Sequence, residues 1–322
     1  MSRSPQDQLV HFLSDMYSVE QQALAQLVSA PDIAKEPTLA GDFRQHHAET
    51  EHQAQRVRER LEACGGSPSA IKDAVMKLGG KGFLLFAQIQ PETPGRLVVH
   101  AYSYEAMEWA GYEMLRRFAE RVGDNQTVET ARAIGAQERE MMERLARGFN
   151  AAEQAAHVET PPHELKEHVA KHLAEVHAFE SQGMQLLKKS ENIAGDPSLE
   201  AIYSEHAERM QVHARLVEQR LDTLSSDASG VMDAAMGLGG LNWGLFFQAQ
   251  QDTPAKLAAF VYAFLHLEIG GYELLKRTAL RNGDAETEQL CDTILAEKRA
   301  MAERLAGAFD VAVQATLDAV QA

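Results

Sequence analysis

The stretch Glu143–Ala146, with the sequence ERLA, recurs unchanged at Glu303–Ala306, 160 residues later. Gly111–Glu113 (GYE) recurs at Gly271–Glu273 with the same offset. The offset of 160 holds without gaps across most of each half. A repeat of this length indicates a duplicated domain rather than one unit of a solenoid. The chain therefore contains an internal control, because functional residues that are present in one copy and absent from the other can be identified by comparing the two.

Composition and charge exclude several classes of function. The chain has 322 residues, enough for two domains of ordinary size, and a net charge of −16. Such an acidic chain repels phosphate backbones, so nucleic acid is not an expected partner, whereas cations are natural ligands. Cys64 and Cys291 do not match across the repeat, which indicates a reducing compartment without disulfides.

The chain also lacks the sequence signals of export and of membrane insertion. Its polar N-terminus does not resemble a signal peptide. The longest apolar run, Leu257–Leu265, is far shorter than the roughly 20 residues of a membrane span. We therefore expect a cytoplasmic protein with no membrane partner.

Capping signals divide each half into four long helices. Ser4-Pro5 and Thr253-Pro254 place a capping side chain before a proline, and Gly123 follows a long periodic stretch. No segment alternates apolar and polar residues as a half-buried strand does. We predict helices over about 5–30, 37–64, 94–122 and 126–152, then over about 162–194, 197–224, 254–282 and 285–319.

The connections between these helices predict the fold. A linker at about 154–162 separates a domain at 1–153 from a second at 162–322. The second and third helices of each half are joined by about 28 residues, which include a short helix, Ser67–Leu78 or Asp227–Leu238. The predicted fold class is all-α: two tandem ferritin-like four-helix bundles with a long crossover between helices 2 and 3. The apolar segments Gly82–Phe86 and Trp243–Phe247 are expected to pack that crossover or to join the halves.

Each long helix of the first half places a carboxylate on its inward face, near its midpoint. An unpaired buried carboxylate is costly, and several at one depth need a strong positive charge among them, which two metal ions would supply. Glu49-x-x-His52 has the spacing for a shared metal, and carboxylates with an imidazole suit iron or manganese. The inward polar candidates are Glu20, His46, Glu49, His52, Gln53, Glu105, Glu108, Tyr112 and Glu138.

Each of these residues also has a purely structural interpretation. A single inward glutamate is more often a salt-bridge partner, and a Glu-x-x-His pair alone is a weak signal. Any one of His46, His47 and His52 could be solvated. His168 and His172 could bind a surface metal, although a solvated histidine face is the default. The coincidence of carboxylates on four helices at one depth is what favours a metal centre.

The second half has lost part of this constellation. Adding 160 maps Glu20 to Glu180 and Glu108 to Glu268, but Glu49 to Arg209, His52 to Val212, Glu105 to Leu265 and Glu138 to Lys298. Two carboxylates facing two basic residues need no metal, because a salt-bridged core can replace it. We predict that the second half is a degenerate, structural copy.

Three stretches of the first half resemble a known bacterial family, the YciE/YciF-type ferritin-like proteins. They are Leu9–Gln22, His46–Glu51 and the pattern Glu105-x-x-Glu108-x-x-x-Tyr112. The wider ferritin-like group includes rubrerythrin, whose di-iron site is similar to this set. The resemblance implies two iron ions, with manganese as an alternative, held by Glu20, Glu49, His52, Glu105, Glu108 and Glu138. The histidine that usually follows the glutamate of helix four is absent, since Met141 and Met142 stand there.

The resemblance implies a stress-related protein whose N-terminal site oxidises Fe(II) or reduces O2 or peroxide. The alternative is a non-catalytic structural stress protein with a vestigial or purely structural metal site. A hollow iron-storage shell is disfavoured, because a tandem pair uses much of the assembly surface internally. The two halves are expected to pack as an intramolecular pseudo-dimer, with homo-oligomers as a further possibility.

Overall fold

A computed structural model describes residues 4–68, 93–158, 161, 164–190, 193–224 and 253–321. Every regular element in these ranges is an α-helix, and the prediction of an all-α, duplicated helical bundle is confirmed. The first half contains α1 (Pro5–Leu27), α2 (Ala30–Ala34), α3 (Pro37–Ala63), α5 (Thr93–Val122) and α6 (Asn125–His157). The second contains α7 (Leu165–Ser190), α8 (Pro197–Leu224), α11 (Pro254–Asn282), α12 (Ala285–Gly307) and α13 (Phe309–Gln321).

Helix ends follow the local chemistry of the sequence. The Ser4 hydroxyl accepts a hydrogen bond from the Asp7 amide at 3.1 Å, and the Asp7 carboxylate accepts one from the Ser4 amide, which closes a capping box at the start of α1. The Thr253 side chain caps α11 in the same place relative to its proline. Gly283 ends α11 at φ 71°, a left-handed conformation that favours glycine.

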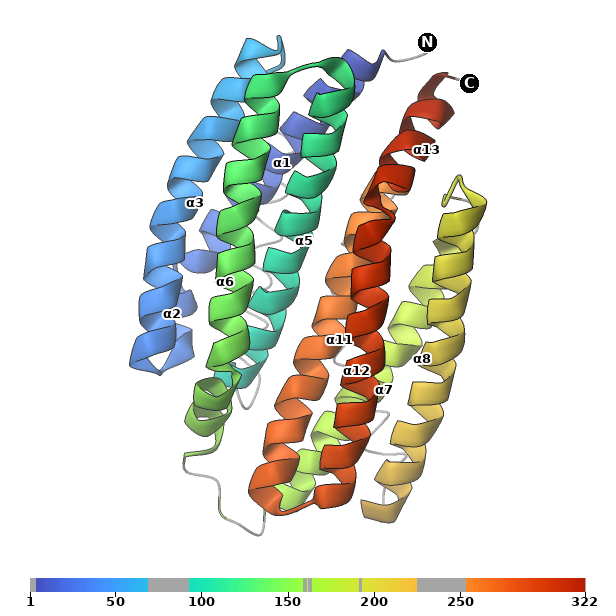
Figure 1. Ribbon diagram of the computed structural model, residues 1–322. Coiled ribbons are helices and arrows are strands. Elements are labelled where there is room, and N and C mark those ends of the chain that lie inside the picture. The colour runs from blue at the N-terminus through green and yellow to red at the C-terminus, as the bar shows by residue number, and fades with distance from the viewer. Residues whose placement is uncertain are drawn as a thin grey trace.

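The four long helices of the first half form a bundle in which α3 and α5 run in the same direction (Figure 1). The Arg60 guanidinium, near the end of α3, contacts Asp124 after the end of α5 at 2.8 Å, so both helices finish at one end of the bundle. The sequence between these helices, including Ser67–Leu78 and Gly82–Phe86, lies outside the described residues, as do Asp227–Leu238 and Trp243–Phe247.

Two predicted helices are interrupted. The first ends at Leu27 rather than near residue 30, because Pro31 lacks the amide hydrogen that would continue the hydrogen-bond ladder, and α2 follows instead. The last predicted helix divides into α12 and α13 at Gly307 and Ala308, where glycine, a poor helix former, sits at the break.

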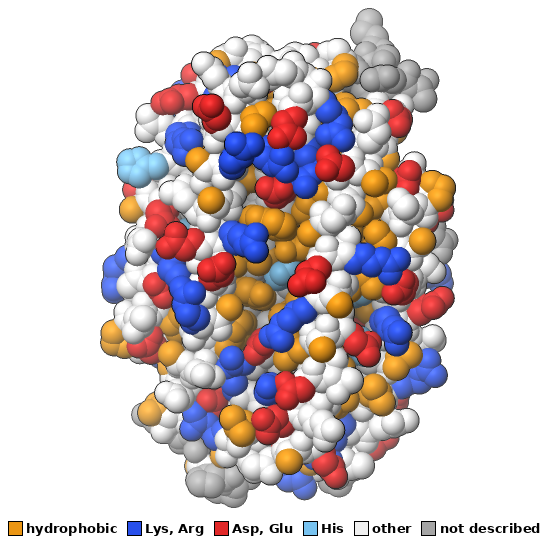
Figure 2. Space-filling view, in the orientation of Figure 1, with side chains coloured by type: hydrophobic (Ala, Val, Ile, Leu, Met, Phe, Trp, Pro, Cys, Tyr) orange, Lys and Arg blue, Asp and Glu red, His pale blue; other side chains and the backbone are white. Residues whose placement is uncertain are grey.

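Several contacts between the two halves are related by the offset of 160. Lys256 contacts Asp15 at 3.0 Å, and their counterparts Arg96 and Glu175 contact each other at 2.5 Å. The Ser103 hydroxyl donates a hydrogen bond to the carbonyl of its own counterpart, Ala263, at 2.7 Å. Such reciprocal contacts are those of an interface with two-fold symmetry. Helices α5 and α11 lie at its centre (Figure 1), and apolar side chains fill the seam between the flanking charges (Figure 2).

Asp124 anchors the start of α6 and provides a test of this framework. Its carboxylate accepts hydrogen bonds from the Thr127 amide and from Arg60. Burial alone would raise the pKa of Asp124, but hydrogen bonds from the Thr127 hydroxyl and amide, and then from Cys64 and Arg60, lower it to about 2, from an ordinary value of 3.8. A depressed carboxyl pKa contributes stability above the unfolded value, and that contribution is lost as the pH falls through the folded value.

We therefore expect Asp124→Ala to lower the free energy of unfolding by about 1–2 kcal/mol at neutral pH. In urea titrations the difference from the wild type should be largest above about pH 4 and should shrink toward about pH 2. A difference that stays constant across this range would contradict the assigned role of the carboxylate.

Candidate metal centre

Four helices of the first half bring acidic side chains and one histidine to a common depth. Glu20 comes from α1, His46 from α3, Glu105 and Glu108 from α5, and Glu138 from α6, and all five are buried. On α3 the buried positions recur every three or four residues, as on any helix with one face in a core. His46 occupies one of these positions, so helix periodicity alone directs it inward.

Ligand atoms of four residues converge closely enough to hold one ion. One atom from each of His46, Glu105, Glu108 and Glu138 lies within 4.8 Å of all the others. The His46 Nε2 atom lies 3.0 Å from Glu105 Oε2 and 3.5 Å from Glu138 Oε2. A group of buried carboxylates around one imidazole can bind a metal ion.

The carboxylates of this group lack the hydrogen bonds that buried oxygens normally make. Both oxygens of Glu108 and both of Glu138 have no hydrogen-bond partner among the described residues. Glu20 accepts a hydrogen bond from the Tyr112 hydroxyl through one oxygen, and its other oxygen has none. These five oxygens are candidate metal ligands, since a bound cation would satisfy them.

The electrostatics of the protein without metal show the same deficit of positive charge. Burial, reinforced by the neighbouring carboxylates, raises the pKa of Glu108 and Glu138 well above its usual range. Burial is also the main reason that the pKa of Glu20 rises to about 8. Burial lowers the pKa of His46, but the carboxylates around it, Glu105 first, outweigh this effect and raise that pKa well above its ordinary value.

Two residues of the predicted ligand set, Glu49 and His52, are not among the five buried residues at the common depth. His52 is exposed on α3, and the histidine among the carboxylates is His46. Glu49 is half-buried, and its Oε2 atom contacts Arg144 at 2.8 Å and the His46 Nδ1 atom at 3.3 Å. The hydrogen bond from His46, together with that from Arg144, lowers the pKa of Glu49 to about 2. Glu49 is thus positioned to hold the imidazole with its Nε2 atom toward the carboxylates.

The sequence did contain a signal for His46. Its buried neighbours on α3 include Phe43 and Thr50, three and four residues away, whereas His52 lies off this stripe. The repeat points to the same residue, because His46 maps to His206 but His52 maps to Val212. The Glu-x-x-His spacing had instead led to the prediction of His52, which is exposed, rather than His46, which lies on the buried face of α3.

The repeat corresponds to a known family. A protein-family model described as "Domain of unknown function (DUF892)" matches twice, over residues 4–156 and 164–318. The chain belongs to this family. No solved structure matches the chain. Within the described residues, no helix is long and apolar enough to cross a membrane.

The second DUF892 copy carries an ammonium group among the carboxylates that it retains. The Lys298 Nζ atom lies 2.9 Å from Glu180 Oε1 and 3.0 Å from Glu268 Oε1, and all three side chains are buried. Burial would raise the pKa of Glu180, but Lys298 lowers it to about 2, whereas burial keeps that of Glu268 well above its usual range. One lysine therefore balances one ionised carboxylate.

Other residues of the second copy take different positions from those expected. Arg209 does not face the carboxylates, because its side chain is 56% exposed and contacts Glu297 at 3.8 Å. His206, the counterpart of His46, is buried with Nε2 3.8 Å from Glu268. Burial, and then Lys298, lower the pKa of His206 to about 3, the reverse of the shift at His46. At His46 the surrounding carboxylates outweigh the effect of burial, whereas at His206 burial prevails and Lys298 adds to it.

Equivalent substitutions at Lys298 and Glu138 should have opposite effects on stability. Lys298→Met removes the ammonium group that pairs with the buried Glu180 and should lower the free energy of unfolding by about 3–5 kcal/mol. Glu138→Leu, in protein freed of metal by a chelator, removes an unpaired carboxylate and should raise that energy by about 1 kcal/mol or more. Urea denaturation measures both, and a harmless Lys298→Met change would show that Lys298 does not neutralise this core.

Proposed function

We propose that the N-terminal bundle holds two divalent metal ions, iron or manganese, and uses them to reduce O2 or peroxide as Fe(II) is oxidised. The observation that carries this proposal is the set of buried carboxylate oxygens without hydrogen-bond partners around His46. The proposed ligands are Glu20, His46, Glu105, Glu108 and Glu138. Relative to the set that the family resemblance implies, His46 takes the place of His52, and Glu49 becomes a positioning residue.

Charge balance supports two ions rather than one. Glu20, Glu105, Glu108 and Glu138 carry four negative charges when all are ionised, and two divalent ions balance them. One divalent ion would leave two buried carboxylates to be neutralised by protons. The four-residue group has the geometry to hold one ion, and the free oxygen of Glu20 would extend the donor set toward a second.

Iron and manganese fit the chemistry of the donors. Carboxylate oxygens with one imidazole and no thiolate suit these metals better than a soft metal. Two bound ferrous ions would supply two electrons, which with two protons reduce O2 to hydrogen peroxide, or hydrogen peroxide to water. The stress-protective role that the resemblance implies is consistent with such a reaction.

The remaining residues of the site position the ligands. Glu49 contacts the His46 Nδ1 atom, so that a neutral imidazole presents its Nε2 lone pair to the ion. Arg144 fixes Glu49 in turn, which keeps that carboxylate ionised and outside the donor set. Tyr112 donates its hydroxyl hydrogen to Glu20 and orients that ligand. Glu108 and Glu138 hold protons in the metal-free site and would release them when cations bind.

The repeat supplies a matched test of metal binding. After anaerobic reconstitution with Fe(II), the wild type should contain about two irons per chain, and each bound ion should raise the free energy of unfolding by about 2.7 kcal/mol at a hundredfold excess over its Kd. Glu108→Gln should lose at least one ion, whereas Glu268→Gln, at the equivalent position of the second half, should retain both. Metal analysis that finds no bound iron in the wild type would reject the proposal. Binding without oxidation would leave a purely structural centre.

A second pair of variants tests which histidine is the ligand. His46→Ala removes the buried imidazole and should weaken metal binding by about 10-fold or more, whereas His52→Ala changes an exposed side chain and should leave the affinity unchanged. Competition with a chromogenic chelator measures both affinities, and circular dichroism shows whether each variant is folded. Loss of binding in His52→Ala alone would return the ligand role to His52.

A further inference from the structure

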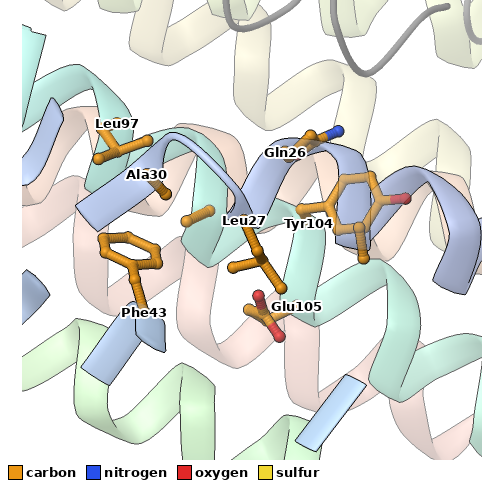
Figure 3. Close-up of a pocket in the computed structure, with 9 residues that line it drawn as sticks. Gln26, Leu27, Ala30, Phe43, Leu97, Tyr104 and Glu105 are labelled. Carbon is orange, nitrogen blue, oxygen red and sulfur yellow. The ribbon is translucent and has the colours of Figure 1, made fainter. Parts of the chain in front are cut away.

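An apolar pocket opens on the N-terminal bundle beside Glu105, one of the clustered carboxylates. It lies among α1, α2, α3 and α5, and the centre of a water-sized molecule can occupy about 20 Å³ of it. Leu27, Phe43, Leu97, Ala101 and Tyr104 are among the residues that line it. Figure 3 shows the side chains of Leu27 and Glu105 facing each other, with Phe43 and Tyr104 to either side.

Glu105 gives this pocket a direct connection to the site. It lines the pocket, and its Oε2 atom lies 3.0 Å from the His46 Nε2 atom. The other polar groups in the lining offer little to a polar ligand. The Tyr104 hydroxyl already donates to the Val19 carbonyl at 3.0 Å, and Gln26 is half-buried. A molecule in the pocket would therefore meet apolar atoms on most sides and a proposed metal ligand at one end.

The residues that correspond to this lining differ in the second half. Gly183 replaces Ala23 of the lining, yet a Cβ atom at Gly183 would overlap Met210 and would lie 2.8 Å from Phe264 Cε1. Val261 stands where Ala101 is, and Leu265 where Glu105 is. Within the described part of the second half, the side chains of Met210 and Phe264 thus occupy the space beside Gly183, the counterpart of Ala23 in the pocket lining.

We propose that this pocket binds a small apolar molecule, of the size and polarity of dioxygen, and delivers it to the Glu105 side of the cluster. A hydrated cation would lose its water in such a lining without replacement ligands, so the pocket does not suit metal entry. Dry apolar cavities bind small apolar molecules, because entry costs little desolvation. The binding site rests on the pocket itself, and only the delivery step rests on the proposed function.

The binding site can be tested in the metal-free protein with two probes. Crystals of the full chain pressurised with xenon should show an atom among Leu27, Phe43 and Tyr104. In solution, dissolved O2 should enhance the methyl relaxation of Leu27 by about fivefold or more over that of its counterpart Leu187, which is similarly buried. Absence of xenon, or equal relaxation of the two leucines, would overturn the proposal.

A matched pair of substitutions fills the pocket or leaves it open. Ala101→Leu adds three carbons to the lining and should abolish both signals, whereas Val261→Leu, at the equivalent position of the second half, should preserve them. Thermal denaturation shows whether each variant is folded. Xenon that persists unchanged in folded Ala101→Leu would show that it occupies some other space.

Kinetic measurements on the iron-loaded protein distinguish delivery of O2 through the pocket from the proposed function of the site. Ala101→Leu should raise the KM for O2 by about threefold or more while kcat stays close to that of Val261→Leu. An unchanged KM would overturn delivery through this pocket. If xenon and O2 bind the metal-free protein but the loaded protein does not turn over, the proposed function fails and the apolar binding site remains.

Discussion

Buried carboxylates of like charge cannot remain ionised together without positive charge between them, and both halves of this protein are organised around that constraint. In the C-terminal bundle the Lys298 ammonium supplies the charge, 2.9 Å from Glu180 and 3.0 Å from Glu268. In the N-terminal bundle the carboxylates have only His46 among them, and most of their oxygens have no hydrogen-bond partner within the described ranges. The contrast within one chain is the main support for a cation in the first half.

The framework around these two cores is nearly the same in each copy. Arg60 contacts Asp124, and Arg220 contacts Asp284, so each bundle fixes the end of its second long helix to the turn before its fourth. The tyrosines Tyr112 and Tyr272 each donate to the glutamate of the first helix, Glu20 or Glu180. At the shared depth the side chains differ, so the same fold accommodates a cluster of acids in one copy and an ion pair in the other.

Much of this arrangement could be predicted from the sequence. The offset of 160 gave the duplication, capping residues gave most helix ends, and helical spacing directed Glu20, Glu105, Glu108 and Glu138 inward. The choice between His46 and His52 could not be made from spacing to Glu49, because each lies three residues from it, one on either side. The ion pair between Glu49 and Arg144 could not be predicted either, because Arg144 lies 95 residues away in the sequence and contacts Glu49 only once the helices pack.

Arg209 illustrates a further limit of prediction from the repeat. Its position matches that of Glu49, and Glu49 itself is half-buried at the edge of the bundle, so its replacement also lies at the edge. Residues that match across the repeat occupy equivalent positions in the fold, but they need not have the same role. The buried lysine could be identified because Glu138, its counterpart, lies fully inside.

The reciprocal contact between Ser103 and Ala263 has a consequence for how the two cores diverged. In a homodimer of identical chains, any substitution appears on both sides of the symmetry axis, so a centre cannot be lost from one subunit alone. Joining the copies in one polypeptide releases them from this restriction while preserving the shared interface. One copy could then acquire an internal lysine, Lys298, while its counterpart in the other copy stayed a glutamate, Glu138. The two copies still pack against each other through α5 and α11, so two different cores share one interface.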